Sequence, residues 1–196
     1  MALFDLGGVV IECTPFSKML EWQTHVRTSD EILTKWSESS AVRDYQLGVI
    51  STKDFAESII EEFELKVGVV RFMREYRLIP KDFYSGAEIL LSQISKNTVT
   101  ACLSNTNELH WKKLCSINNL EKNFKYCFPS HLIHSIKPDE DAFAHVLKVL
   151  NLPADQIAFF DDRAENVETA KKMGFIAFKT EGMKELCTAI QVLNIL

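Results

Sequence analysis

Short apolar runs alternate with segments of helical periodicity from Ser85 onward, and this alternation limits the possible folds more than any other feature. The runs typical of strands are Thr98–Leu103, Tyr126–Pro129, Gln156–Phe160 and Phe175–Phe178. A helix-periodic segment follows each run, which is the pattern of a parallel sheet covered by helices. A shorter apolar run at the start of the chain, Ala2–Phe4, fits the same sheet.

Start and stop signals place the helices between these strands. Ser85 and Glu88 form the pattern of a capping box, which predicts a helix beginning at Ser85. The other predicted helices are one over residues 108–118, one opened by Pro138, one closed by Gly174 and one that begins near Glu181.

Residues 14–83 show a different pattern. Strand signals disappear, and amphipathic helical periodicity appears at residues 29–39, 51–63 and 68–76. The turn Gln46-Leu47-Gly48 precedes the second of these helices. We therefore expect an α/β core, a Rossmann-like parallel sheet with helices on both faces, made of residues 1–13 and 84–196. A small all-helical insertion, residues 14–83, would interrupt it.

Composition argues against several kinds of partner. The chain has 196 residues, with 22 Lys and Arg against 27 Asp and Glu, and no basic run long enough to bind nucleic acid or an anionic membrane. Its five cysteines contain no CxxC pair, which favours reduced thiols. Because neither a signal peptide nor a membrane-spanning stretch is visible, we expect a cytoplasmic protein. Nothing in the sequence predicts its oligomeric state.

Four polar features fall where a predicted strand ends or the next helix begins: Asp5, Ser104, Lys137 and the pair Asp161-Asp162. In an open parallel sheet the carboxyl ends of the strands meet at one crevice, so these side chains should converge. Carboxylates can bind a hard divalent cation there, and a lysine and a hydroxyl can bind phosphate. The set therefore predicts phosphoryl transfer, although each residue alone is more typical of a helix cap, a turn or a solvated charge.

The segments that contain these residues resemble the four ordered motifs of the haloacid dehalogenase-like (HAD) hydrolases. They are FDLGGVV at Phe4–Val10, LSNT at Leu103–Thr106, KPD at Lys137–Asp139 and FFDDRAEN at Phe159–Asn166. Residues 46–51, QLGVIS, also resemble the turn of the helical C1 cap that this family inserts after its first motif. The resemblance spans nearly the whole chain and is strongest to small bacterial sugar-phosphate phosphatases of the glucose-1-phosphate type.

This resemblance implies a Mg²⁺-dependent phosphatase that hydrolyses a small phosphorylated metabolite, with a sugar phosphate favoured. Asp5 would be the nucleophile and form an aspartyl-phosphate. The implied Mg²⁺ ligands are Asp5, the carbonyl of Gly7 and Asp162, with Asp161 either a further ligand or an outer partner. The implied phosphate-binding groups are Ser104, Lys137 and the backbone amides of Leu6 and Asn105. Lys137 would also keep Asp5 ionised, and Asn166 would orient the acidic pair.

Gly7 departs from the family pattern. Most phosphatases of the family have a second aspartate at this position, which protonates the leaving group and then deprotonates the attacking water. General acid catalysis is typically worth about two to four orders of magnitude, so either another group substitutes, the preferred leaving group is a good one, or the enzyme is slow. The candidate substitutes are Glu12, His25, Arg43 and Tyr45. His134 is a second departure, at a position where the family often has glycine.

Two other functions remain open. One is a metal-free 2-haloacid dehalogenase, whose nucleophile likewise lacks the second aspartate, although Asp161-Asp162 would then have no clear role. The other is a catalytically weakened relative that binds a phosphometabolite or a protein as a sensor. Substrate specificity would lie in the helical insertion, where Trp22, Trp36, Arg43 and Tyr45 are candidates, although aromatic residues at such spacing are usually core.

Overall fold

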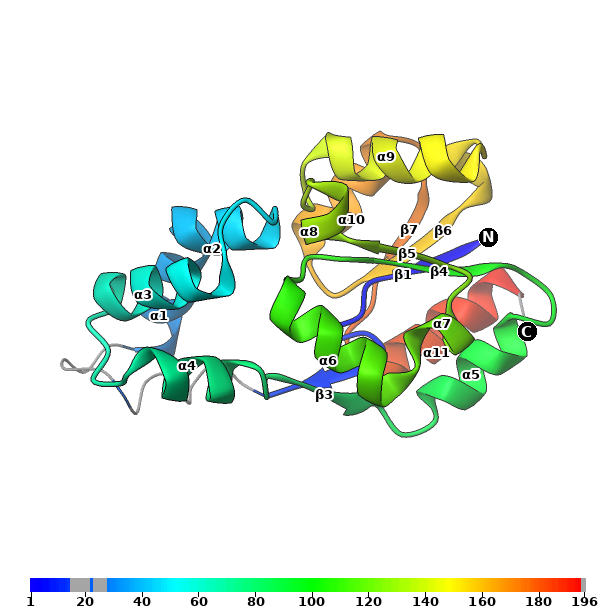
Figure 1. Ribbon diagram of the computed structural model, residues 1–196. Coiled ribbons are helices and arrows are strands. Elements are labelled where there is room, and N and C mark those ends of the chain that lie inside the picture. Colours follow the sequence, from blue (N-terminus) through cyan, green and yellow to red (C-terminus); the bar gives the residue numbers. More distant parts are fainter. Residues whose placement is uncertain (15–21, 23–27, 195–196) are drawn as a thin grey trace.

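The computed structural model describes residues 1–14, 22 and 28–194, and a five-stranded parallel sheet lies at its centre (Figure 1). The strand order is β5-β4-β1-β6-β7. The strands are β1 (Ala2–Phe4), β4 (Thr100–Ser104), β5 (Tyr126–Pro129), β6 (Ala158–Asp161) and β7 (Ile176–Lys179). In the central strand, Leu3 pairs with Ala101 on one side and Phe159 on the other. The predicted parallel α/β sheet is confirmed.

Helices cover both faces of this sheet (Figure 1). One face packs against α8 (Ser130–Ile133), α9 (Glu140–Leu150) and α10 (Ala164–Lys172). The other packs against α5 (Ala87–Ile94), α6 (Glu108–Asn118), α7 (Leu120–Asn123) and α11 (Gly182–Leu193). Successive strand residues point to opposite faces, so Leu3 enters the first core and Phe4 the second. A short 3₁₀ helix, η2 (Ala154–Gln156), precedes β6.

The helical insertion has a core of its own. Its described helices are α1 (Ser29–Glu38), α2 (Ser40–Gln46), α3 (Thr52–Glu62) and α4 (Val69–Tyr76). Phe55, Ile59 and Phe63 lie on one face of α3 and its end, and all three are buried, as their spacing predicts. Figure 1 shows these helices beside the sheet domain, at the carboxyl ends of its strands. The boundaries at residues 13 and 84 stay a prediction.

Two strands that the sequence analysis does not predict connect the insertion to the core. β2 (Ile11–Cys13) and β3 (Pro80–Phe83) pair in antiparallel fashion, with Ile11 opposite Phe83. We refer to this pair as the connecting ribbon. Its second strand contains a proline and two exposed charged residues, so its sequence has no strand signal, and only the pairing with distant residues extends it.

Two helix starts differ from the prediction. α5 begins at Ala87 rather than at Ser85, and the capping box is wrong: Gly86 is the N-cap, with φ of 86° and no side-chain capping bond. The chain turns there with positive φ, which glycine adopts readily, and this turn leaves Ser85 outside the helix. α9 begins at Glu140 with Asp139 as its N-cap, so Pro138 precedes the helix instead of opening it. None of the helices in the described part of the chain has the length and apolar character needed to cross a bilayer.

Candidate active site

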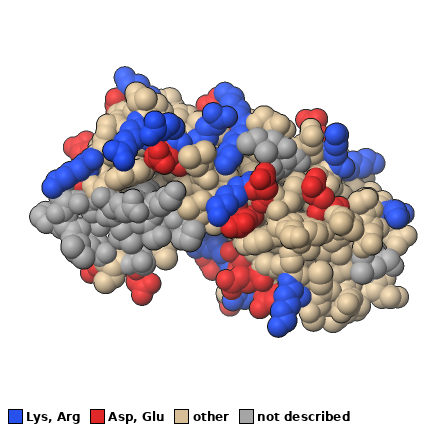
Figure 2. Space-filling view, turned by 90° about the horizontal axis from the view of Figure 1, so that it is seen from below, with Lys and Arg blue, Asp and Glu red and all other residues tan. Residues whose placement is uncertain are grey.

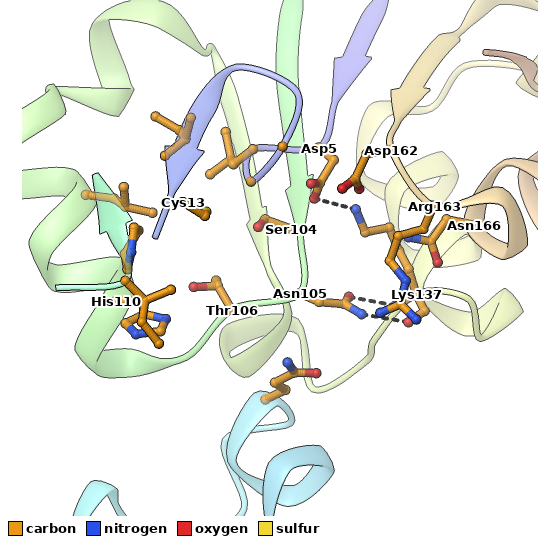
Figure 3. A pocket seen from close by; sticks show the side chains of 18 of the residues that line it. Asp5, Cys13, Ser104, Asn105, Thr106, His110, Lys137, Asp162, Arg163 and Asn166 are labelled. Carbon is orange, nitrogen blue, oxygen red and sulfur yellow. Dashed lines mark hydrogen bonds and ion pairs between the residues drawn. The ribbon is translucent and has the colours of Figure 1, made fainter. Parts of the chain in front are cut away.

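The predicted residues converge at the carboxyl edge of the sheet. Asp5 directly follows β1, Ser104 ends β4, Asp162 directly follows β6, and Lys137 lies in the segment before α9. All four line a cavity of about 450 Å³ (Figure 3). The chain passes from β1 to β4 and β5 on one side and to β6 and β7 on the other, and a change of direction of this kind opens a crevice at the strand ends.

Lys137 is the centre of the site. Its Nζ lies 2.6 Å from Asp5 Oδ1 and 2.6 Å from Asp161 Oδ2. The lysine side chain is 1% exposed and that of Asp161 is 0% exposed, so these charges are almost fully removed from water. Burial by itself would lower the pKa of Lys137, but the two carboxylates together raise it. The buried ammonium therefore stays charged and joins β1 to β6.

The Asp5 carboxyl is under opposing influences. Burial raises its pKa to about 7, Asp161 and Asp162 add to the increase, and Lys137 opposes it. Lys137 thus acts in the direction expected from the sequence but does not outweigh burial. Three carboxylates, those of Asp5, Asp161 and Asp162, thus act electrostatically on one another and on the buried ammonium of Lys137.

The two aspartates of the acidic pair lie in different surroundings. Asp161 Oδ2 accepts from Lys137, and its Oδ1 accepts from the backbone N–H of Arg163 and from Nδ2 of Asn166, both at 2.9 Å. Both of its oxygens are therefore engaged. Asp162 faces the cavity, and its carboxylate makes no side-chain hydrogen bond to another described residue. Burial and the nearby Asp161 raise the pKa of Asp162.

The loop after β1 is shaped to fit Asp162. Gly8 has φ of 77°, and a Cβ on it would lie 2.5 Å from Asp162 Oδ2. The position therefore requires glycine both for its backbone conformation and for the close approach of the carboxylate. The Ile11 N–H donates to the Leu6 carbonyl at 2.7 Å and closes the loop, so Gly7 and Gly8 are held against the cavity.

The donor groups at the cavity fit a magnesium ion. Within the described residues no group of three or more His, Cys, Asp or Glu side chains could hold a metal by itself. Asp5 and Asp162 both line the cavity, as does Gly7, whose carbonyl is the third predicted donor. Asn166 Oδ1 is buried and has no hydrogen-bond partner, and Asn166 lines the same cavity. Mg²⁺ is usually bound by one or two carboxylates together with waters, so this set suits it.

Asn105 has a role that its sequence context does not reveal. Its side-chain Oδ1 accepts from the Lys137 backbone N–H at 2.8 Å, and its Nδ2 donates to the Lys137 carbonyl at 2.6 Å. This paired bond ties the lysine segment to the end of β4 (Figure 3). Ser104, 6% exposed, lines the cavity beside it. The positioning of Lys137 thus depends on a side chain expected to contribute only its amide.

The helical insertion contributes Trp36 and Gln46 to the cavity. The other described candidates from the insertion lie elsewhere. Arg43 pairs with Asp139 of the core at 2.6 Å, and the Tyr45 hydroxyl hydrogen-bonds to Thr52 at 2.8 Å. Trp22 packs on Phe72 within the insertion core. His134 also misses the cavity, because its Nδ1 lies 2.9 Å from the carbonyl of Leu47.

Cys13 and His110 line the cavity, although nothing in the sequence pointed to either of them. Cys13 lies on the unpredicted strand β2, and a Cβ built on Gly7 would lie 3.2 Å from its sulfur. Although the residue as a whole is exposed, partial burial of the thiol, with Asp5 and Asp162 nearby, raises the pKa of Cys13 to about 11. Neither a strand signal nor a motif marks this position.

His110 is the other unexpected cavity residue, and it joins α6 to the insertion. Its Nε2 donates to the carbonyl of Tyr76 at 2.7 Å, and its Nδ1 accepts from Asn107 Nδ2 at 3.2 Å. The ring also stacks on Tyr76, with centroids 4.3 Å apart. Burial lowers the pKa of His110 to about 4, so the ring is neutral near pH 7. This pairing is tertiary, and a histidine within a helix gives no sign of it.

The molecule is thus an α/β protein, with a parallel sheet, a buried lysine between carboxylates at the strand ends and an inserted helical unit. The family model of the haloacid dehalogenase-like hydrolases matches residues 1–174. The chain belongs to this family and is a hydrolase, which confirms the resemblance found in its motifs.

Several relatives resemble the chain along most of its length. The D-ribitol-5-phosphate phosphatase of Bacteroides thetaiotaomicron is 22% identical over 91% of this chain and 90% of its own. A HAD family enzyme of the same organism, solved in complex with magnesium and inorganic phosphate, has a TM-score of 0.76 at 21% identity and covers 92% of this chain and 93% of its own. A HAD-like family hydrolase of Porphyromonas gingivalis has a TM-score of 0.78 at 20% identity, covering 98% and 96%. The two structures show a shared fold.

Proposed function

We propose that the protein is a Mg²⁺-dependent phosphatase that hydrolyses a small phosphorylated metabolite, with a sugar phosphate favoured, through an aspartyl-phosphate on Asp5. The main observation behind this proposal is the buried Lys137 ammonium, 2.6 Å from both Asp5 and Asp161, beside an Asp162 carboxylate that faces the cavity. The sugar-phosphate substrate of one relative, and the magnesium and phosphate bound to another, support it. The cytoplasmic location expected from the sequence is part of the same proposal.

In this mechanism Asp5 attacks phosphorus and the leaving group departs, after which water hydrolyses the aspartyl-phosphate. Lys137 favours the ionised form of Asp5 and attracts the phosphoryl oxygens. Ser104 and the backbone amides of Leu6 and Asn105 would donate hydrogen bonds to the same oxygens. These donors lie on chain segments that already line the cavity, so binding phosphate requires little rearrangement.

We assign the metal ligands to Asp5, the carbonyl of Gly7 and Asp162. Bound Mg²⁺ would offset the repulsion between the anionic nucleophile and the anionic phosphate. Asp161 has both oxygens engaged, so we assign it the outer role, in which it holds Lys137 in place. Asn166 would hold Asp161 through Nδ2, and its free Oδ1 is available to a metal-bound water.

The test is the variant Asp5→Asn, assayed for phosphate release with and without Mg²⁺ on a panel of sugar 1-phosphates, sugar 6-phosphates, nucleotides and acyl phosphates. We expect turnover to fall by several orders of magnitude, as when a catalytic nucleophile is removed. Asp155→Asn, at an exposed position in η2, is the matched control and should keep wild-type turnover. Metal-dependent phosphate release by Asp5→Asn at the wild-type rate would refute the proposal.

Because Gly7 replaces the usual second aspartate, two alternative functions also need to be tested. A 2-haloacid dehalogenase would release chloride from 2-chloropropionate in the presence of a chelator, whereas the cavity-facing Asp162 favours a metal-dependent reaction. A weakened sensor would show a thermal shift with Mg²⁺ and a sugar phosphate but no turnover of any compound in the panel. Rapid hydrolysis of one compound in the panel would exclude it.

A further inference from the structure

Cys13 lies where a side chain at position 7 would project. Strand β2 of the connecting ribbon runs from Ile11 to Cys13. Gly7 forms a β-bridge with Ile11 at the start of this strand. A Cβ on Gly7 would come within 3.2 Å of Cys13 Sγ, a separation tighter than ordinary van der Waals contact. Figure 3 shows Cys13 on the part of the cavity near Ser104 and Asp5. A carboxylic acid at position 7 would therefore press against the thiol of Cys13, which would have to shift slightly to admit it.

Of the four candidates for the missing acid, His25 lies outside the described residues, and the other three are held away from the cavity. Glu12, on the same strand as Cys13, pairs with Lys81 across the connecting ribbon at 2.8 Å and does not line the cavity. Arg43 and Tyr45 are bonded outside the cavity. His110 lines the cavity, but both of its ring nitrogens have protein partners. Among described residues, Cys13 is thus the side chain that takes the place of an acid at position 7.

We propose that Gly7 and Cys13 form a coupled pair that sets leaving-group specificity. With Gly7 and Cys13 there, the chain has no carboxylic acid at the position from which most phosphatases of the family protonate the leaving group, so the enzyme favours phosphates whose leaving group needs no proton. Acyl phosphates would react fastest, phosphates on the acidic anomeric hydroxyl of a sugar next, and phosphates on ordinary alcohols slowest. This inference rests on the proposed phosphatase function and narrows its substrate class.

The reaction balances without a general acid. An Asp5 oxygen forms a bond to phosphorus, the bond from phosphorus to the acyl oxygen breaks, and its electron pair leaves on the carboxylate, which is stable without a proton. Water then adds to phosphorus, the Asp5 carboxylate is released, and both protons of the water end on the phosphate product. An alcohol phosphate would instead expel an alkoxide, whose poor stability slows the first step unless an acid supplies a proton.

The experiment is a leaving-group series of aryl, acyl and alkyl phosphates, with kcat/KM plotted against the pKa of the leaving group. An enzyme without a general acid gives a steep decline, whereas an enzyme with one gives a shallow decline. We expect a steep decline for the wild-type protein. The variants are Gly7→Asp, Cys13→Ala and the double variant, and Gly68→Asp is a matched control, because a Cβ there meets no atom within 4 Å.

The double variant should accelerate alcohol phosphates at least ~10-fold beyond the product of the two single effects, because removing the sulfur makes room for the new acid. The decline of kcat/KM with leaving-group pKa should also become shallower in the double variant, whereas Gly68→Asp should show the same steep decline as the wild-type protein. A shallow decline of kcat/KM in the wild-type protein would overturn the inference. It would also be overturned if Gly7→Asp alone accelerated alcohol phosphates as much as the double variant does. The wild-type series needs no variant, so the test stands even if Gly7→Asp does not fold. If the folded, Mg²⁺-supplied protein released no phosphate from any aryl or acyl compound, the phosphatase proposal itself would fail.

Discussion

The side of the cavity formed by the sheet and the side formed by the insertion differ in how their groups are held. On the sheet side, Lys137 and Asp161 are buried; Lys137 donates to Asp5 and to Asp161, and Asp161 also accepts from Asn166. On the insertion side, Trp36 and Gln46 come from helices whose positions depend on apolar packing. The comparison shows that the polar groups of the sheet side are fixed by buried hydrogen bonds, whereas the residues of the insertion side are positioned by apolar packing. If the proposed function holds, the insertion is the part that can change substrate selection.

The strongest test of the sheet side is Lys137→Met. It should abolish turnover and lower the free energy of unfolding by about 3 to 5 kcal/mol, because two buried carboxylates lose their partner. Chemical denaturation and phosphate release measure the two effects. Lys148→Met, at an exposed position on α9, is the control, and wild-type stability of Lys137→Met would contradict the importance of the buried pairing.

The two aspartates of the acidic pair should separate metal binding from lysine positioning. Saturating Mg²⁺, at about 100 times its dissociation constant, should stabilise the wild-type protein by about 2.7 kcal/mol. Asp162→Asn should lose most of this stabilisation, whereas Asp161→Asn should keep more of it but start from a less stable apo protein. Thermal denaturation with and without Mg²⁺ measures both. An equal loss in the two variants would show that both aspartates ligate the metal.

The junction between the two sides should respond to pH through His110. Its folded pKa of about 4 lies below the ordinary histidine value, so the folded protein binds fewer protons than the unfolded chain between these values. This contribution to stability is complete above about pH 6.5 and is lost as pH falls toward 4, by about 2 to 3 kcal/mol. Unfolding free energies across this range should show a smaller slope for His110→Gln. An unchanged slope would mean that other groups cause the loss.

The smallest change in stability is expected when the contact between the insertion and the segment after Lys137 is removed. Arg43→Ala removes an ion pair with Asp139 in which both side chains are about half exposed, so stability should fall by less than about 1 kcal/mol. High salt should reduce even that difference. A loss comparable with that of Lys137→Met would show that the insertion is held to the core as firmly as the site itself.

The sequence predicted the residues that local signals mark and missed those whose positions depend on tertiary pairing. The residues at strand ends, such as Asp5 and Ser104, were located because apolar runs are local signals and parallel strands bring their carboxyl ends together. Cys13 and His110 were missed because their positions depend on tertiary pairing. The pairing of Ile11–Cys13 with Pro80–Phe83 has no local signal, and the contact of His110 with Tyr76 joins α6 to α4, which lie far apart in the sequence.

Local rules failed where the backbone conformation decided the outcome. Ser85 and Glu88 match the capping pattern, yet the left-handed Gly86 between them is the N-cap and the helix begins at Ala87. Asn105 was expected to offer its backbone amide, while its side chain binds both backbone groups of Lys137. A motif identifies the residue type that a site needs, but it does not say which of that residue's atoms are used.

The connecting ribbon makes the insertion exchangeable. Because Ile11 and Phe83 are opposite each other in an antiparallel pair, the points where the chain leaves and re-enters the core are only about 5 Å apart. A unit of different size or shape could be grafted there without altering the spacing of the sheet. Under the proposed function, an exchange at this ribbon would change substrate specificity while leaving the proposed phosphate-binding residues of the sheet unchanged.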